Sequence, residues 1–445
     1  MCNTVVQDYF CDMNSQFYLS FFIMTLGMDG FNMLIPHSGC SSGKEISYEN
    51  YKIARGDIAL PQNSLLAIPA IGQVCSTFGL HPSLSGLRQM YTANELAFIA
   101  NTGILQRSGV TEENWRSFHD KTSLFSHNTQ TEETANVDVY GKLSGLGVGG
   151  RMLDILAADG YKTGAISVSG SAPPIVSKSS PLLVVSPNGY DKFNPILDNP
   201  YTNSDKKFGN DVTDAVKEMN GATTAGSTFY GDSWSDKLLL ALADNSLLFE
   251  TLQHATLSTA FPDTHIGKQM ATIAKMMQIR DVRGKDRDVF FAEVGGWDMH
   301  FDIASPLEDR LKEIDNSLIA FRAEMKARGV WDDVTVVYVS EFARTLFGNT
   351  GNGSDHAWGG NYWVAGGDID GGKILGTFPD DLTNASPIVF QPGIVIPTTP
   401  WEAVWNAVAQ WFGIADSSKL DYVLPNREEF LDDLFTQADL YGYGA

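Results

Sequence analysis

Apolar positions along this chain follow two alternating patterns, which predict buried β-strands separated by amphipathic helices. Continuous runs of β-branched and aromatic residues at 17–24, 288–294 and 334–339 each predict a buried strand. Between the last two runs, apolar residues recur at helical spacing over 305–326, and Gly329 follows as a C-terminal stop signal. Strands that alternate with helices in this way are typical of an α/β fold.

The rest of the chain repeats this alternation. Further strands are predicted at 96–101, 164–168, 181–186, 362–365 and 373–376, and further helices at 48–54, 83–93, 150–159 and 400–412. The segment 103–145 is polar and weakly periodic, which predicts a long loop of the kind that often carries function. The segment from about 194 to 285 predicts a helical insertion covering the sheet, with helices at 211–218, 235–258 and 264–279.

Together these elements predict one α/β domain over 17–435, with a mostly parallel central sheet and helices on both faces. We expect 1–16 to be a peripheral N-terminal segment and 436–445 to be a C-terminal tail. A chain of 445 residues is long enough to bury a large core in such a domain.

Three of the predicted strands run into side chains suited to metal binding or acid–base chemistry. These are Asp29 after the first, Asp298 and His300 after the second, and Glu341, Asp355 and His356 after the third. Ligands bind at the carboxyl ends of strands in open α/β sheets. Because converging carboxylates repel one another unless a cation or a proton lies between them, this arrangement favours a metal site.

The overall charge excludes some classes of partner. Lys and Arg total 31 against 53 Asp and Glu, which gives a net charge of −22. This balance argues against nucleic acid and anionic membrane surfaces as partners. No run of about 18 apolar residues is present, so we expect no transmembrane helix.

The N-terminal part of the chain does not determine the cellular compartment of the protein. The four cysteines lack the close pairing of a zinc ribbon or redox motif, so no disulfide is assigned between Cys2, Cys11, Cys40 and Cys75. The first residues have no basic segment, and they contain Asp8 and Asp12, unlike a secretory signal. Either the protein is not exported or its leader lies outside this sequence.

Ordered blocks of sequence along most of the chain carry a family resemblance. The blocks are MDGFNMLIP, LFSHNTQ, GVGGRMLD, GGWDMH, SEFARTL, GSDHAWGGNYWVAGG, GGKILGTFP and VIPTTPWEAVWNAVAQWFG with LPN. With these blocks the chain resembles the bacterial family called domain of unknown function 1501, whose members look like relatives of the alkaline phosphatase and sulfatase superfamily. The resemblance implies an alkaline phosphatase-like fold and a periplasmic or extracellular address.

The resemblance also implies roles for individual residues, since in that superfamily Asp, Glu and His at strand ends hold one or two divalent metals beside a hydroxyl or modified Cys nucleophile. It implies metal ligands at Asp29, Asp298, His300, Glu341, Asp355 and His356. The metal is left open between Zn, Ca, Mg and Mn. No Cys-x-Pro-x-Arg motif is present, so the formylglycine mechanism of common sulfatases is not indicated.

The remaining predicted site residues concern catalysis and substrate binding. Ser126 is the implied nucleophile, and His127 is the implied proton carrier, with His356 as the alternative. Arg344, Arg151 and Asn128 are the implied contacts of the anionic group, because a guanidinium offers a planar fork to phosphate or sulfate oxygens. The structural alternatives are an ordinary loop hydroxyl at Ser126, an acidic partner for Arg344 and a helix-start cap at Arg151.

These observations predict a metal-dependent hydrolase of phosphate or sulfate esters. The substrate would be an anionic small molecule or a polysaccharide ester such as a sulfated polysaccharide. The rival hypothesis is a non-catalytic secreted or surface protein that keeps the hydrolase fold and acts in binding or assembly. The oligomeric state is not determined by these patterns.

Overall fold

The computed structural model describes residues 17–24, 27–118, 124–187 and 250–443, together with scattered residues between 214 and 248. Its main sheet is formed by β1 (Phe17–Met24), β5 (Leu96–Gly103), β6 (Thr163–Ser167), β7 (Leu182–Val184), β8 (Arg287–Glu293), β9 (Val334–Ser340), β10 (Gly360–Gly366), β11 (Ile374–Leu375) and β14 (Thr399–Pro400). The strand order is β11-β5-β10-β9-β1-β8-β6-β7, and β14 pairs with β5. The predicted α/β class is confirmed.

The centre of this sheet brings distant parts of the chain together. β1 lies between β8 and β9 and is parallel to both, with Phe22 opposite Ala292 on one side and Tyr338 on the other. The carboxyl ends of these three strands therefore meet at one edge. β8 and β9 are buried along nearly their whole length, as expected for strands covered on both faces.

The prediction of a mostly parallel sheet needs correction, because the sheet is mixed. β10 runs antiparallel to both of its neighbours, β5 and β9. A separate antiparallel sheet of order β2-β4-β3 comprises Leu34–Cys40, Cys75–Leu80 and Leu66–Pro69, and β12 (Val389–Phe390) pairs with β13 (Ile394–Val395). The alternation of strands and helices did not reveal the direction of β10, because that direction depends on how the long loop after β9 returns to the sheet.

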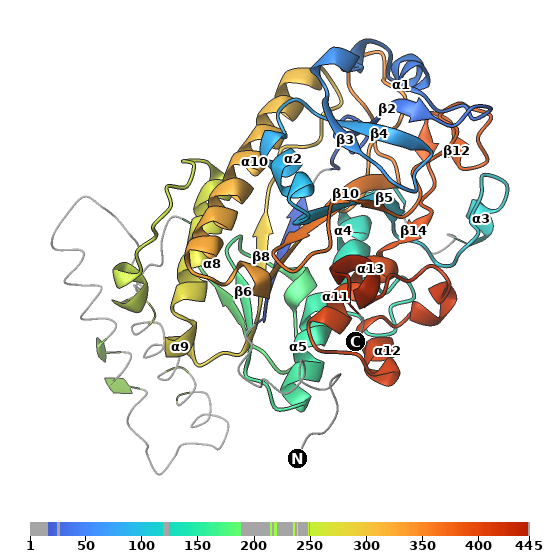
Figure 1. The fold of residues 1–445 in the computed structure, drawn as a ribbon. Helices are drawn as coiled ribbons and strands as arrows, with labels where there is room; N and C mark the ends of the chain where they lie inside the picture. Colours follow the sequence, from blue (N-terminus) through green and yellow to red (C-terminus); the bar gives the residue numbers. More distant parts are fainter. Residues whose placement is uncertain are drawn as a thin grey trace.

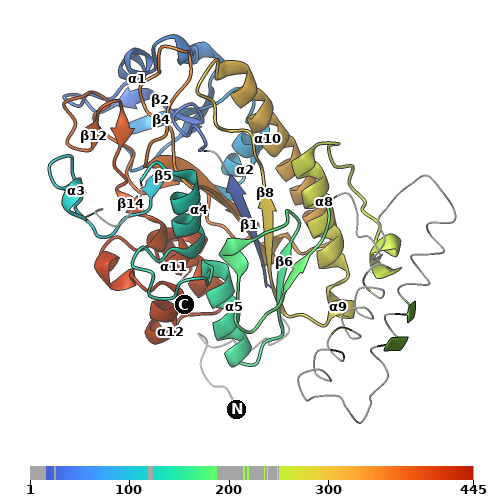
Figure 2. The same ribbon diagram turned by 180° about the vertical axis from the view of Figure 1, so that it is seen from behind.

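Helices cover both faces of the sheet. They are α1 (Tyr48–Arg55), α2 (Ser85–Thr92), α3 (Trp115–Phe118), α4 (His127–Asn136), α5 (Val148–Ala158), α8 (His265–Gln278), α9 (Arg280–Arg283), α10 (Ala304–Ala327), α11 (Trp401–Trp411), α12 (Ser417–Val423) and α13 (Gln437–Tyr441). In Figures 1 and 2, α8 and α10 lie on one side of β1, β8 and β6, whereas α4 and α5 lie on the other. The apolar stripe predicted for α10 is buried, including Leu307, Leu311 and Leu318.

The predicted loop over 103–145 differs from the structure, and the predicted insertion over 194–285 is described only in part. The helix α4 lies within the segment 103–145 that was predicted to be a loop. Because its sequence HNTQTEETAN has almost no apolar residues, the apolar pattern did not predict a helix there. The predicted helical insertion is described from residue 250 onward, where α8 agrees with the helix expected at 264–279. The helices expected at 211–218 and in most of 235–258, and the N-terminal segment 1–16, lie outside the described residues.

A disulfide joins Cys40 at the end of β2 to Cys75 at the start of β4. Both cysteines face each other across the ladder, a pairing that sequence spacing left open. Within the described ranges, no helix combines the length and apolar character needed to cross a bilayer.

Candidate metal centre

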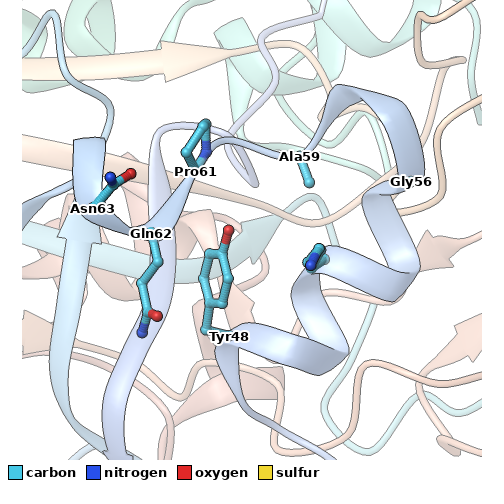
Figure 3. Close-up of a pocket in the computed structure, with 7 residues that line it drawn as sticks. Tyr48, Gly56, Ala59, Pro61, Gln62 and Asn63 are labelled. Carbon is cyan, nitrogen blue, oxygen red and sulfur yellow. The ribbon is translucent and has the colours of Figure 1, made fainter.

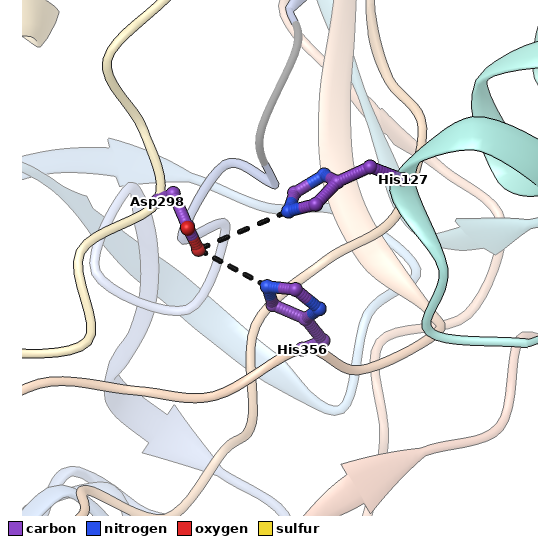
Figure 4. A group of neighbouring side chains, drawn as sticks. All are labelled: His127, Asp298 and His356. Carbon is purple, nitrogen blue, oxygen red and sulfur yellow. Dashed lines mark hydrogen bonds and ion pairs between the residues drawn. The ribbon is translucent and has the colours of Figure 1, made fainter.

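Four side chains meet at the carboxyl edge of the central strands. Asp298 and His300 follow β8, His356 lies in the loop between β9 and β10, and His127 is the first residue of α4. Asp298 Oδ1 is 2.8 Å from His300 Nε2, 3.0 Å from His356 Nε2 and 4.0 Å from His127 Nε2. Figure 4 shows His127 and His356 both pointing at the carboxylate of Asp298. We call these four residues the His–Asp cluster.

The other ring nitrogen of each histidine is held by an acceptor. His127 Nδ1 donates to Glu341 Oε1 at 2.9 Å, and His300 Nδ1 donates to Asp355 Oδ1 at 2.9 Å. His356 Nδ1 donates to the carbonyl oxygen of Phe125 at 3.0 Å. Because carboxylates and carbonyls only accept, each Nδ1 carries a hydrogen, and each ring turns its Nε2 toward Asp298.

This arrangement offers ligand atoms for a cation. Three imidazole nitrogens beside one carboxylate oxygen can be held together by a metal ion or by hydrogens on the rings. His127 Nε2 is buried and makes no hydrogen bond, so one donor atom is left for a ligand. The ligand atoms of His127, Asp298 and His356 all lie within 4.8 Å of one another.

The spacing and chemistry of the His–Asp cluster fit a zinc-like ion. Zinc bonds to His nitrogen and carboxylate oxygen are roughly 2.0–2.2 Å long, which in a tetrahedron separates ligand atoms by about 3.3 Å. The three Nε2 atoms lie 2.8 to 4.0 Å from Asp298 Oδ1, and His300 Nε2 lies 3.2 Å from His356 Nε2. Histidines held at Nδ1 by carboxylates or carbonyls are also the usual outer shell of such sites.

The buried side chain of Arg344 contacts Asp298 of the His–Asp cluster. Its guanidinium is fully buried and donates to Asp298 Oδ1, to Gly27 O at 3.1 Å and to Ser354 O. Burial alone would raise the pKa of Asp298, but hydrogen bonds from His356 and Arg344 hold this pKa below its usual value. The lowered pKa favours the ionised form of Asp298, and the buried Arg344 has no free face for a substrate.

Two carboxylates predicted as metal ligands contact histidines instead. Glu341 has a fully buried side chain, and its second oxygen, Oε2, accepts from Ser340 Oγ at 3.0 Å. Asp355 Oδ1 accepts from Asn349 Nδ2 at 3.0 Å as well as from His300. Burial alone would raise the pKa of Asp355, but the hydrogen bonds from His300 and Asn349 keep this pKa below its usual value. In this structure both carboxylates orient a histidine ring.

Asp29 makes a different set of contacts from the His–Asp cluster. Its Oδ1 accepts the backbone N–H groups of Phe31 at 3.1 Å and Asn32 at 3.2 Å. Its Oδ2 forms a buried ion pair with Arg55. Both oxygens are therefore engaged in holding the turn after β1, so we do not retain Asp29 among the proposed ligands.

Ser126 lies immediately before His127, at the N-cap of α4, and is half-buried. Its hydroxyl makes no capping bond to the helix. The preceding Phe125 has a φ of 69°, a left-handed conformation that non-glycine residues adopt at a cost. Gln130 accepts the N–H of Phe125, and His356 binds its carbonyl, so this turn is held on both sides.

Arg151 and Asn128 are the other two predicted substrate contacts, and their surroundings differ. Arg151 is fully buried and donates to the carbonyl oxygens of Val423 at 2.8 Å, Leu146 at 2.6 Å and Asn136. It therefore ties the end of α4 to α5 and α12. Asn128 is exposed on the first turn of α4.

A surface pocket of about 460 Å³ lies apart from this cluster. Tyr48, Gly56, Pro61 and Gln62 are among the residues that line it (Figure 3). The Tyr48 hydroxyl already donates to Leu60 O at 2.8 Å, and none of the lining residues belongs to the His–Asp cluster.

Residues 251–391 match the family model described as "Protein of unknown function (DUF1501)". The resemblance predicted from the sequence blocks is thereby confirmed over this part of the chain. The match includes Asp298, His300 and His356, whereas His127 lies outside it.

Solved structures give weaker similarities. The lipoteichoic acid synthase LtaP from Listeria monocytogenes has a TM-score of 0.31 and 10% identity, covering 77% of this chain and 60% of that chain. The C-terminal periplasmic domain of EcEptC from Escherichia coli, in complex with Zn, has 0.35 and 8%, covering 90% and 83%. The PsFucS1 sulfatase from Pseudoalteromonas sp. has 0.31 and 13%, covering 92% and 70%.

This chain thus spans less than two thirds of the LtaP chain. At TM-scores below 0.5, these similarities are too weak to establish a common fold. No curated protein matches the chain.

Proposed function

We propose that this protein is a metal-dependent hydrolase of phosphate or sulfate esters. The observation that carries the proposal is the convergence of three Nε2 atoms on Asp298 Oδ1, with one of them, in His127, buried and without a hydrogen bond. The ester class comes from the family resemblance in the sequence. When bound, a divalent metal supplies Lewis-acid chemistry that neutralises an anionic ester.

His127, His300, His356 and Asp298 would hold the metal. Three imidazoles with a single carboxylate favour zinc over calcium or magnesium, which prefer oxygen ligands. Arg344 fixes Asp298 from the buried side.

Ser126 is the proposed nucleophile. It stands next to His127 at the start of α4, where the first backbone N–H groups of a helix favour an anion. The strained turn at Phe125 holds this position, since strained backbone persists where surrounding contacts enforce it. Attack of the hydroxyl on phosphorus or sulfur would release the alcohol and transfer the anionic group to Ser126.

We also propose an exported location. Disulfides persist in oxidising compartments such as the periplasm and the cell exterior, and the bond between Cys40 and Cys75 fits that setting. Reduced Cys40 and Cys75 in protein isolated under thiol-blocking conditions would contradict it.

The test is elemental analysis of purified, unchelated protein, coupled to a screen of phosphate and sulfate esters. We expect stoichiometric metal in the wild type and loss of metal and turnover in His356→Ala. His254→Ala, which changes an exposed histidine elsewhere, is the matched control and should retain both. Metal that the variant loses, with no turnover of any ester, would favour the rival role of a non-catalytic binding or assembly protein.

A further inference from the structure

Phe301, the residue after His300 of the His–Asp cluster, exposes its ring to solvent. It is 75% exposed, although its neighbour His300 contacts both Asp298 and Asp355. Single exposed apolar side chains are ordinary on protein surfaces, as at Ile71, which is 90% exposed. Phe301 differs from such a residue because backbone hydrogen bonds to a second loop hold the residues that follow it.

The glycine- and asparagine-rich loop after β9 holds the Phe301 segment in place. Asp302 N donates to Gly351 O at 3.0 Å, and Ile303 N donates to Asn352 O at 2.9 Å. Asp302 and Asn352 both have left-handed backbones, with φ of 44° and 55°. The two backbone hydrogen bonds join the loops and fix the chain on the C-terminal side of Phe301.

The same loop supports the ring directly. A Cβ atom on Gly351 would lie 2.5 Å from Phe301 Cδ1, so the ring occupies the space that a side chain at position 351 would need. Asn349 Nδ2 donates to His300 O at 3.0 Å and to Asp355 Oδ1 at 3.0 Å. The ring and the proposed ligand His300 are therefore positioned by the same loop.

We infer that Phe301 is a specificity-determining residue that stacks against a flat ring in the alcohol part of the ester. This inference rests on the proposed function, since it places the anionic group at the His–Asp cluster and the ring of the alcohol on Phe301. Aromatic side chains add apolar contact area beside the few polar groups that orient a ligand. The substrate class is then an ester of a cyclic alcohol, either an aryl or a sugar ring.

The test compares binding of phenyl phosphate, a hexose phosphate and methyl phosphate by calorimetry, with the metal content of each sample measured. We expect the wild type to bind a ring-bearing ester more tightly than methyl phosphate. Phe301→Ala should weaken the ring-bearing ester about tenfold. It should leave methyl phosphate binding and metal content unchanged.

A second variant keeps the phenylalanine but moves it. Gly351→Ala should displace the ring and weaken the same ring-bearing ester, whereas Ile71→Ala should change nothing. Preference for phenyl phosphate identifies an aryl ester, and preference for the hexose phosphate identifies a sugar ester. A wild type without ring preference, or a preference that survives in Phe301→Ala, overturns the inference.

These results are separable from the proposed function. Ring preference that survives in Phe301→Ala, in protein that carries metal and hydrolyses esters, rejects the stacking role alone. Protein without metal or turnover rejects the hydrolase, while ring binding that Phe301→Ala abolishes would still support the stacking subsite.

Discussion

Glu341 accepts the Nδ1–H of His127 across 214 positions of sequence, at 2.9 Å and with the carboxylate fully buried. This contact connects the end of β9 to the start of α4. It fixes the rotation of the imidazole so that Nε2 faces Asp298. Orientation of histidine by a buried acceptor is how metal sites gain affinity beyond their direct ligands.

The carboxylates that orient the histidines should matter for metal affinity without being ligands. Asp355→Asn keeps the shape of the side chain but weakens the acceptor for His300 Nδ1. We expect metal affinity to fall about 10- to 100-fold, measured by titration in a metal buffer. Asp302→Asn is the control, because asparagine suits the left-handed backbone there. Equal affinities for both variants would contradict the role of Asp355.

Ser126 should be needed for turnover and not for metal. Ser126→Ala removes the hydroxyl at the N-cap of α4, where it makes no capping bond, so the helix should lose little stability. We expect activity to fall about 1,000-fold or more, with metal content and melting temperature close to those of the wild type. Undiminished turnover would exclude Ser126 as the nucleophile and direct attention to a water molecule.

Asp29 should matter for stability. The ion pair with Arg55 is buried on both sides, so Asp29→Asn leaves a buried guanidinium without its counter-charge. We expect a loss of about 3–5 kcal/mol in the free energy of unfolding, measured by denaturant titration. The folded fraction should still bind metal stoichiometrically. Loss of metal from folded Asp29→Asn protein would restore Asp29 as a ligand.

Buried Glu402 should make stability depend on pH. Burial in α11 raises the pKa of this carboxyl from 4.5 to about 8, although the charge of Arg151 acts to lower it. Between those pH values the folded state binds more protons than the unfolded state, so this residue makes unfolding easier as pH rises. The effect is absent below about pH 4.5 and complete above about 8.

Glu402→Gln removes this titration while keeping the size of the side chain. The variant should match the wild type near pH 5 and be the more stable protein near pH 8, in unfolding experiments at both values. Asp432→Asn offers a control at an exposed carboxyl group. Parallel stability profiles of wild type and Glu402→Gln would show that Glu402 is ionised in the folded protein.

Much of the architecture was predictable because it depends on local pattern. The apolar runs that became β1, β8 and β9, and the helical spacing of α10, are properties of short segments. β10 and α4 were harder to predict. The direction of β10 depends on how a connection folds back. α4 consists almost wholly of polar residues, so its sequence carries no apolar period, although Gln130 and Thr134 are buried in the folded protein.

The sequence by itself determined the α/β class, the edge where strands deliver charged side chains, and the presence of Asp298, His300 and His356 at that edge. These follow from periodicity and from motifs within a few residues of one another. Only the tertiary structure decided which atoms converge. His127, predicted from the sequence as a proton carrier, lies 171 residues before Asp298 and turns its Nε2 toward that carboxylate, while Glu341 and Asp355 each contact a histidine ring. The tertiary structure also paired Asp29 with Arg55. The physical reason is that hydrogen bonds and metal coordination act over about 2–3 Å, and such proximity between distant segments exists only once the chain has packed.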